Sequence, residues 1–423
     1  MRVGLVIDVF DPHRGGAEHW TFQWAQWLLA RGHEVHVVAQ RFTTAGLQLP
    51  IIPHCLGRIR SRRSRAAAAE ARLRRLHLDI IHDMGMGWYC DVLEPHDGSQ
   101  LAIREQKLLM VRPWLRPLLR RVVRLLPRYR ALAKLQRCQF ASRPQLVLAL
   151  SQRVARDYRL YHGLPERDIR LVYNGVDTER FSPGRRQEHR AASRRQLGIR
   201  PGAMCVLFIA HNHRLKGLPT AIRAVQRMAS QGEKVHLVVV GGKPGRAAHG
   251  ARTNTLGNVV TYVGVVQDTL PYYAAADVFV LPTYSDACSL TVLEAAACGV
   301  PSVTTQFNGV GELLTDGVNG YVLSDPADDS QLANRLRMLL DSAQRRQMGQ
   351  AARQLALRHT LDSNFGRILA VYAEIIDRKA DHGMWPAAAV QMAGDRPPAS
   401  PSGHPAGQQR PAGPESQTLR KAA

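Results

Sequence analysis

Acidic side chains are scarce in this sequence, and several familiar patterns are missing from it. The 423 residues include 34 aspartates and glutamates against 57 lysines and arginines, for a formal net charge of +23. The six cysteines show no Cys-x-x-Cys or Cys-x-His spacing, so we expect free thiols rather than a zinc site or a disulfide framework. No window holds roughly eighteen uncharged apolar residues, and the apolar run at 1–7 is too short for a signal peptide. These absences predict a cytoplasmic protein without a membrane-spanning helix.

The length of the chain and the order of its apolar runs predict an α/β protein with two domains. A chain of 423 residues exceeds what one hydrophobic core usually supports. Short apolar runs alternate with helical segments, which is typical of a doubly wound parallel sheet, here in two copies. The expected strands are 2–7, 34–38, 80–82, 146–150, 204–209, 235–240, 259–263, 278–281 and 300–304. We therefore expect two Rossmann-like domains.

The predicted boundaries follow from where the strand pattern stops and restarts. The first domain is expected at 1–190 and the second at 200–360, because the charged run between them has no strand signal. A helix at 361–380 is expected to return to the first domain. Residues 386–423 are rich in Pro, Gly, Ser, Gln and Ala, so we predict a disordered tail there.

The segment 281–323 carries the most specific signal. Asp286 and Glu294 lie eight positions apart across the start of a short helix. This helix is expected to begin near Leu290, with Ser289 as its N-cap. Ligands of an open α/β sheet bind beyond the carboxyl ends of its strands, and Asp286 lies there. Free amides at a helix start can hold an anion, and carboxylates can accept hydrogen bonds from sugar hydroxyls. The segment therefore predicts a site for a ligand with both groups, such as a nucleotide-sugar.

Two other strand ends carry candidate site residues. Gly15 and Gly16 lie between the first strand and its helix, where backbone amides can approach a phosphate or sugar, although a plain turn has the same pattern. Arg214 and Lys216 follow the strand 204–209 and can stabilise the charge of a departing diphosphate without a metal. The alternative is a pair of surface cations on a loop. Further polar candidates at strand ends are His82, His96, Asp97, His211 and His213.

A basic and proline-broken segment occupies 104–140. Eleven lysines and arginines lie between Arg104 and Arg137, and Glu105 alone opposes them. Leucines, valines and one tryptophan are interleaved with these cations, which is typical of a segment that lies on an anionic membrane surface. The residues expected to face the membrane are Arg112, Trp114, Arg116, Arg120, Arg121 and Arg124. The alternative is a core helix with a solvated basic face, and nucleic acid is not expected because no recognition motif is present.

Together these residues resemble the family 4 glycosyltransferases, which are retaining, nucleotide-sugar-dependent enzymes of the GT-B fold. The resemblance covers about residues 1–380 and is strongest in the acidic-x7-acidic signature of Asp286 and Glu294, continued by Asn308 and Gly309. It implies two Rossmann-like domains that face each other across a cleft. It also implies that Glu294 binds the ribose hydroxyls of the nucleotide and that Asp286 contacts the donor sugar.

The resemblance assigns further roles and exposes one departure. Arg214 and Lys216 match the pair that holds the diphosphate, and the family chemistry needs no metal or other cofactor. The positions that it implies for donor binding besides Glu294 are Gly15, Gly16, Val265, Val266, Ser289, Leu290, Asn308 and Gly309. Either His96 or Asp97 corresponds to the family residue near the reacting centre. The family usually has glutamate where this chain has Asp286, whose side chain is one methylene shorter.

Within the family, the basic segment resembles the membrane-interacting region of the lipopolysaccharide core glucosyltransferases. This resemblance implies a peripheral enzyme on the inner face of the cell membrane that moves a hexose from a UDP-sugar to a lipid-linked envelope glycan. Front-face displacement within an ion pair is the mechanism it implies. The alternatives are a nucleotide-sugar epimerase with the same two-domain cleft and a non-catalytic protein that binds membranes or anionic polymers.

Overall fold

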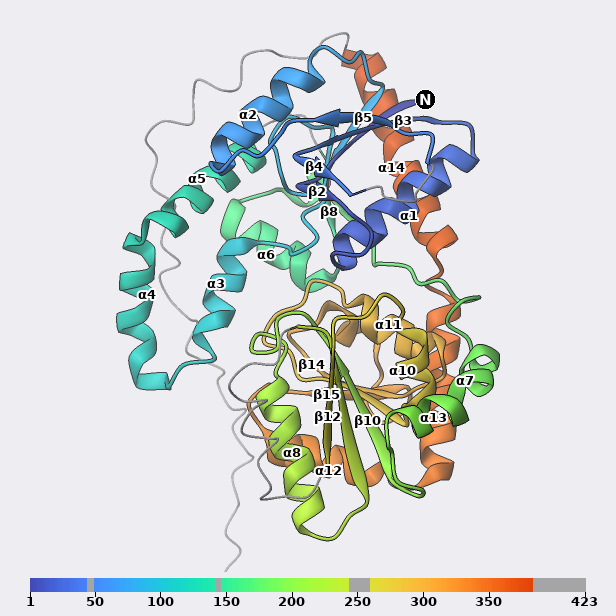
Figure 1. Ribbon diagram of the computed structural model, residues 1–423. Coiled ribbons are helices and arrows are strands. Elements are labelled where there is room, and N and C mark those ends of the chain that lie inside the picture. The colour runs from blue at the N-terminus through green and yellow to red at the C-terminus, as the bar shows by residue number, and fades with distance from the viewer. Residues whose placement is uncertain (44–48, 142–145, 243–258, 383–423) are drawn as a thin grey trace, which may run out of the picture.

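A computed structural model describes the chain over residues 1–43, 49–141, 146–242 and 259–382. Within these ranges the chain forms two α/β domains, which Figure 1 shows one above the other, each built on a parallel sheet. The prediction of two parallel-sheet domains is confirmed. The predicted tail at 386–423 lies outside the described residues.

The first domain is built on a sheet with the strand order β5-β3-β1-β6-β7-β8-β9, in which all neighbours run parallel. Its strands are β1 (Arg2–Val6), β3 (Glu34–Ala39), β5 (Ile52–Cys55), β6 (Ile80–Asp83), β7 (Val92–Leu93), β8 (Leu146–Ala149) and β9 (Ile169–Leu171). Two short strands, β2 (Val9–Phe10) and β4 (Arg41–Phe42), follow β1 and β3 and pair with each other. Strands β1 and β8 are almost entirely apolar because helices cover both faces of a parallel sheet.

The helices of the first domain include a projecting arm that coincides with the basic segment. The helices are α1 (Gly16–Ala30), α2 (Arg62–Leu73), α3 (Gln100–Leu108), η1 (Pro113–Leu115), α4 (Arg116–Leu125), α5 (Pro127–Ala141) and α6 (Gln152–His162). Pro113 and Pro127 each begin a new helix, so the prolines divide the segment into short pieces, as predicted. Figure 1 shows α3, α4 and α5 along one side of the domain. In the described ranges, no helix combines the length and the apolar character that a membrane crossing requires.

The second domain repeats the architecture with the strand order β12-β11-β10-β13-β14-β15. Its strands are β10 (Met204–Ile209), β11 (Val235–Val240), β12 (Val260–Gly264), β13 (Val278–Leu281), β14 (Ser302–Thr305) and β15 (Gly320–Leu323). Its helices include α7 (Pro183–Gln196), α8 (Leu218–Ser230), α10 (Leu270–Ala275), α11 (Leu290–Ala297), η3 (Gly309–Leu313), α12 (Asp329–Met338) and α13 (Ser342–Leu357). The order places the carboxyl ends of β10, β13 and β14 side by side, which brings the loops after them into one site.

The boundary between the domains lies earlier than predicted. Helix α7 packs on α10 of the second domain, where Arg190 Nη2 lies 2.6 Å and Arg194 Nη1 2.9 Å from the Asp277 carboxylate. The same arginines donate to carbonyl groups at the carboxyl end of α10, where a helix favours cations. Residues 183–190 therefore belong to the second domain, and the predicted limit at residue 190 is wrong. The charged run has no strand signal because it is a helix.

The last described helix, α14 (Leu361–His382), returns to the first domain, as predicted. Trp20 Nε1 donates to Asn364 Oδ1 over 3.2 Å, and Trp24 Nε1 donates to the Tyr372 hydroxyl over 3.1 Å. Phe365 packs between the two tryptophan rings, and all of these side chains are buried. The helix thereby joins both domains through a buried contact, and Figure 1 shows it running beside α1.

Candidate active site

The loop after β13 holds Asp286 at the start of α11. The Asp286 amide donates to the Phe307 carbonyl over 3.0 Å, and its carbonyl accepts from the Gly309 amide over 3.0 Å. Asn308 accepts from the Ser289 amide over 3.3 Å, so the two loops after β13 and β14 hold each other. The structure therefore brings the predicted residues Asp286, Ser289, Asn308 and Gly309 together at one end of α11.

Lys216 joins this cluster from the neighbouring loop after β10. Its Nζ lies 2.6 Å from Asp286 Oδ2 and donates to the Ser285 carbonyl over 3.1 Å. Both side chains of the ion pair are largely buried, which strengthens their attraction. Arg214 lies two residues earlier and is exposed, and no ion pair engages it among the described residues. The loop thus offers one cation already fixed on a carboxylate and one that remains available to an anion.

Glu294 lies in the middle of α11 and is held by a buried tyrosine. The Tyr273 hydroxyl donates to Glu294 Oε2 over 2.7 Å. Burial raises the pKa of the Glu294 carboxyl to about 7, and the hydrogen bond from Tyr273 opposes that rise. This carboxyl can therefore exchange its proton near neutral pH and leaves Oε1 available to a ligand hydroxyl.

The helix start itself differs in one respect from the prediction. Ser289 occupies the N-cap position of α11, but its side chain accepts no backbone hydrogen bond there. Its hydroxyl lies 2.9 Å from the Thr291 hydroxyl instead. Ser289 is therefore the N-cap residue, as predicted, but a neighbouring hydroxyl competes for its side chain, so it makes no capping hydrogen bond. The amides of the first turn, beginning at Leu290, have no serine cap and remain suited to an anion.

The first domain faces this cluster with its glycine loop. Gly15 is the N-cap of α1, and a Cβ atom at Gly16 would lie 3.3 Å from Cδ1 of Leu290. The predicted phosphate loop of one domain thus lies against the start of α11 in the other. Val265 and Val266 follow β12, and the Val265 side chain is 62% exposed. Their contact with a nucleotide base stays a prediction.

Helix α6 of the first domain docks on the Asp286 loop. The Arg153 guanidinium donates to the Asp286 carbonyl over 2.6 Å, and the Asn174 amide donates to the Cys288 carbonyl over 2.8 Å. A Cβ atom at Gly309 would lie only 2.6 Å from the Ser151 Cβ, so the close approach of the two domains requires glycine there.

A carboxylate of the second domain caps the same helix. Glu312 Oε2 accepts from the Gln152 amide over 2.8 Å and from the Tyr173 hydroxyl over 3.0 Å, and Oε1 accepts from the Arg153 amide over 2.7 Å. The first two amides of α6 have no partner within their own helix, and a helix start favours negative charge. Glu312 therefore stabilises the observed contact between the domains, and we call it the interdomain cap.

The structure places His96 and Asp97 in different surroundings, a difference that the sequence does not reveal. His96 is partly buried, with its ring edge-on to Trp20 at 4.8 Å between centroids, and its Nε2 has no partner among the described residues. Asp97 is exposed. Burial lowers the pKa of His96, so its ring is neutral at pH 7. His96 is therefore an uncharged ring whose buried Nε2 has no partner among the described residues.

Two other histidine candidates have structural partners. His82 is fully buried, with Nδ1 2.8 Å from the Tyr372 hydroxyl and Nε2 3.0 Å from Glu94. His213 Nε2 lies 2.9 Å from the Gly241 carbonyl. These rings hold the α14 contact and the loop after β10, and His82 does not lie on the surface that a substrate reaches. His211 is exposed.

Some of the predicted membrane-facing residues already have partners within the protein, and others are exposed to solvent. Arg116 donates to two backbone carbonyls of the preceding turn, and Arg120 Nε lies 2.8 Å from Glu105 Oε2. Arg112 and Arg121 are exposed, whereas the side chain of Arg124 lies outside the described residues. Apolar side chains on the same arm also face solvent. They are Trp114, Leu118, Val122, Leu125 and Leu126, with exposed fractions between 43% and 74%. Over 114–126 the alternative of a core helix with only its basic face in solvent is therefore wrong, whereas α5 does bury Leu135 and Phe140.

Three residues that shape this site carry no sequence signal for a role. Arg153 and Tyr273 come from helices with no motif, and each reaches its partner only through the tertiary fold. Glu312 closes the Asn-Gly-Val-Gly-Glu run, which the sequence marks as part of the signature without a function for its glutamate. A buried tyrosine opposite a helix carboxylate leaves no local signal.

Two family profiles match the chain. Residues 14–180 match the profile described as Glycosyltransferase Family 4, and residues 203–342 match the one described as Glycosyl transferases group 1. The curated relatives include the D-inositol 3-phosphate glycosyltransferase 2 of Catenulispora acidiphila, which is 30% identical over 55% of this chain and 56% of its own length. The enzyme of the same name from Salinispora arenicola is 33% identical over 49% and 50%. The chain thus spans about half the length of the curated relatives it matches.

Solved structures share the fold over nearly their whole length. WaaG, a glycosyltransferase involved in lipopolysaccharide biosynthesis, superposes with a TM-score of 0.73 at 22% identity, over 88% of this chain and 99% of its own. Anabaena HepE in complex with UDP and glucose gives a TM-score of 0.66 at 20% identity, over 88% and 99%. These likenesses establish the GT-B fold, as predicted. With two facing parallel-sheet domains and both profiles in chain order, the protein belongs to the family 4 glycosyltransferases.

Proposed function

We propose that this glycosyltransferase is a retaining hexosyltransferase that moves a sugar from a UDP-sugar to a lipid-linked glycan of the cell envelope. The observation that carries the proposal is the partly buried pair of Lys216 and Asp286, 2.6 Å apart near the start of α11, where Gly16 of the other domain approaches Leu290. A structural neighbour that holds UDP and glucose supports the choice of donor.

The donor would lie along α11. Its diphosphate would meet the free amides at the helix start together with Arg214 and Lys216, and Glu294 would accept from the ribose hydroxyls. Asp286, held by Lys216, would accept from hydroxyls of the sugar. This arrangement gives the diphosphate, the ribose and the sugar each a partner of matching chemistry.

The transfer would proceed on one face of the sugar. As the bond between the anomeric carbon and the phosphate oxygen breaks, Arg214 and Lys216 meet the charge that develops on the diphosphate, so we propose that no metal is required. The acceptor oxygen bonds to the anomeric carbon from the same side, and its proton passes to the leaving phosphate oxygen. His96 contributes a neutral ring nitrogen to the sugar rather than a charge.

The acceptor would reach the cleft from a membrane. The arm exposes the tryptophan at 114 and the leucines at 118 and 125 beside cations, which is the composition of a segment lying at an anionic interface. We therefore propose a peripheral protein on the inner face of the cell membrane. The names of the curated relatives point instead to D-inositol 3-phosphate, so the acceptor class is what an experiment must decide.

Two measurements test the proposal. A thermal-shift panel of UDP-, GDP-, ADP- and TDP-sugars should give its largest stabilisation with a UDP-sugar, since a ligand that binds only the folded state raises its stability. Labelled UDP-glucose should then transfer to a lipid-linked glycan in anionic vesicles with retention at the anomeric carbon. Glu294→Gln should lose turnover, whereas Glu188→Gln on the exposed face of α7 should keep it. Epimerised UDP-sugar formed without acceptor would instead identify an epimerase.

A further inference from the structure

A second hollow opens in the first domain beside the glycine loop. It has a volume of about 370 Å³ and is lined by five arginines and one carboxylate, which we call the arginine pocket. These charged residues are Asp8, Arg14, Arg41, Arg58, Arg60 and Arg65. The volume falls within the range of roughly 300–1,000 Å³ that small-molecule sites occupy.

The parallel sheet explains why these residues meet. β5, β3 and β1 are neighbours in the sheet. Arg58 and Arg60 follow β5, Arg41 follows β3 as the first residue of β4, and Asp8 and Arg14 follow β1. Ligands of an open α/β sheet bind at this edge. Arg14 directly precedes Gly15, the N-cap of α1, so the arginine pocket adjoins the loop that faces α11.

The charge in the pocket is not balanced by the protein. Asp8 accepts from the Arg65 guanidinium and from Gln40 Nε2, the latter over 2.5 Å, so its charge is already engaged. In the part of the chain that the structure describes, no hydrogen bond or ion pair engages the guanidinium groups of Arg41, Arg58 and Arg60. Several unpaired guanidinium groups around one hollow repel each other unless an anion binds between them.

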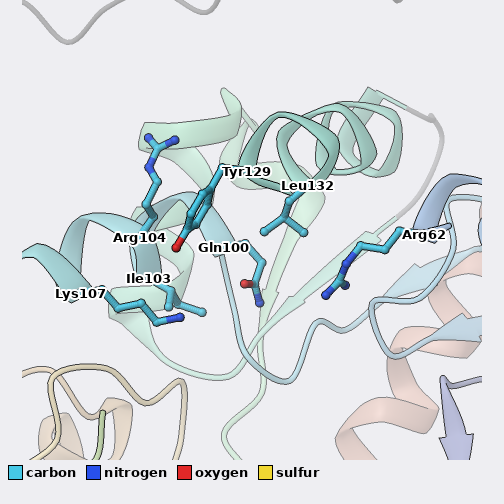
Figure 2. A pocket seen from close by; sticks show the side chains of 7 residues that line it. All are labelled: Arg62, Gln100, Ile103, Arg104, Lys107, Tyr129 and Leu132. Carbon is cyan, nitrogen blue, oxygen red and sulfur yellow. The ribbon is translucent and has the colours of Figure 1, made fainter. Parts of the chain in front are cut away.

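Helix α2, which follows the pocket, is destabilised by cations in its first turn. α2 begins with Arg62, Arg63 and Arg65 in its first turn and has no acidic residue there. Cations at a helix start oppose the helix dipole. A different hollow, lined by Arg62 and shown in Figure 2, also carries Arg104 and Lys107, but its volume of about 40 Å³ leaves no room for a sugar. Of these two hollows, the arginine pocket is therefore the one in which an anion would be bound more favourably.

We propose that the arginine pocket binds a phosphate group carried by the acceptor. Guanidinium groups match phosphate oxygens in pairs, and a doubly charged phosphate balances the three free cations better than a carboxylate does. The inference rests on the proposed function, since it takes the first domain as the acceptor side. It adds the substrate class, an acceptor phosphorylated close to the hydroxyl that receives the sugar.

Calorimetric titration of the full chain with inorganic phosphate tests this inference. UDP is first added to saturation so that the donor phosphate site is filled, and potassium chloride keeps the ionic strength constant. Arg58→Gln and Arg60→Gln should each weaken phosphate binding about tenfold, the loss expected for one charged hydrogen-bonded contact. Arg63→Gln is the matched control, since it removes the same charge from the same segment but does not line the pocket, and its affinity should stay within about twofold of wild type.

The outcomes separate this inference from the donor proposal. UDP affinity is measured in every variant and should not change in Arg58→Gln or Arg60→Gln. Failure of the wild type to bind UDP would refute the donor proposal alone, because the phosphate titration can be run without UDP. An equal loss of phosphate affinity in Arg63→Gln, or no phosphate binding by the wild type, would overturn the proposal that the arginine pocket binds phosphate. So would Arg60→Gln weakening co-sedimentation with phosphatidylglycerol vesicles while free phosphate binding stays intact, since the pocket would then serve lipid headgroups.

Discussion

Replacing Glu312 with alanine should open the two domains without unfolding either of them. The side chain is exposed, but it accepts hydrogen bonds from the Gln152 and Arg153 amides and from the Tyr173 hydroxyl, all between 2.7 and 3.0 Å. α6 keeps its own cap in the variant, because Ser151 Oγ accepts from the Val154 amide over 3.2 Å. The loss therefore falls on the interdomain contact rather than on the helix.

The magnitude follows from the contacts that Glu312 makes. A capping side chain contributes about 0.5–2 kcal/mol, and the exposure of Glu312 argues against the larger values for buried charged hydrogen bonds. A loss of about 1–2 kcal/mol changes the ratio of closed to open molecules by about 5- to 30-fold. The bonds from Arg153 to Asp286 and from Asn174 to Cys288 remain, so the domains should stay associated part of the time.

Small-angle scattering and donor affinity measure this effect. Glu312→Ala should increase the radius of gyration and weaken UDP-sugar binding by up to the same 5- to 30-fold factor, because only the closed form completes the site. Glu312→Gln keeps one acceptor oxygen and should give a smaller effect. Glu188→Ala removes an exposed carboxylate of α7 and should change neither quantity. If Glu312→Ala leaves both the scattering and the affinity at wild-type values, the interdomain cap has no role in closure.

Three further predictions concern the donor site and the arm. UDP-glucose affinity should rise about tenfold between pH 6 and pH 8, because burial raises the pKa of the Glu294 carboxyl to about 7 and this group accepts ribose hydroxyls fully only when deprotonated. Calorimetry of Glu294→Gln should give a flat profile. Lys216→Met should lower the transfer rate by about 100-fold or more, whereas EDTA should leave the wild-type rate unchanged; a rate that EDTA abolishes would contradict metal independence. Leu118→Ser together with Trp114→Ala should weaken co-sedimentation with anionic vesicles, and Leu357→Ser, an exposed leucine of the second domain, should not.

The strands and the core of the donor site could be predicted because their signals are local. Strands such as β10 and β11 are buried on both faces, so β10 is a continuous apolar run in the sequence and β11 is one apart from His236. Asp286 and Glu294 lie on one short helix and the loop before it, and their separation is visible in the sequence. Even there, Ser289 is the predicted N-cap residue, but its hydroxyl contacts Thr291 instead of a backbone amide, which the N-cap rule does not consider.

The domain boundary shows where local signals mislead. The run of arginines in α7 has no apolar periodicity, so it resembles a linker in the sequence. Its helix forms because Arg190 and Arg194 find Asp277 and the carbonyl groups at the end of α10. These partners lie about eighty residues away along the chain and become neighbours only when the second domain folds.

By itself, the sequence determined the two parallel-sheet domains, the family and the acidic signature, since each is encoded in short runs or fixed spacings. Only the tertiary structure decided which distant side chains share a site. Glu312 caps a helix 160 positions away, and the arginine pocket takes its charges from the segments after three separate strands and from α2. The physical reason is that a parallel sheet brings the carboxyl ends of non-consecutive strands to one edge, while the charges there interact through space and not along the chain.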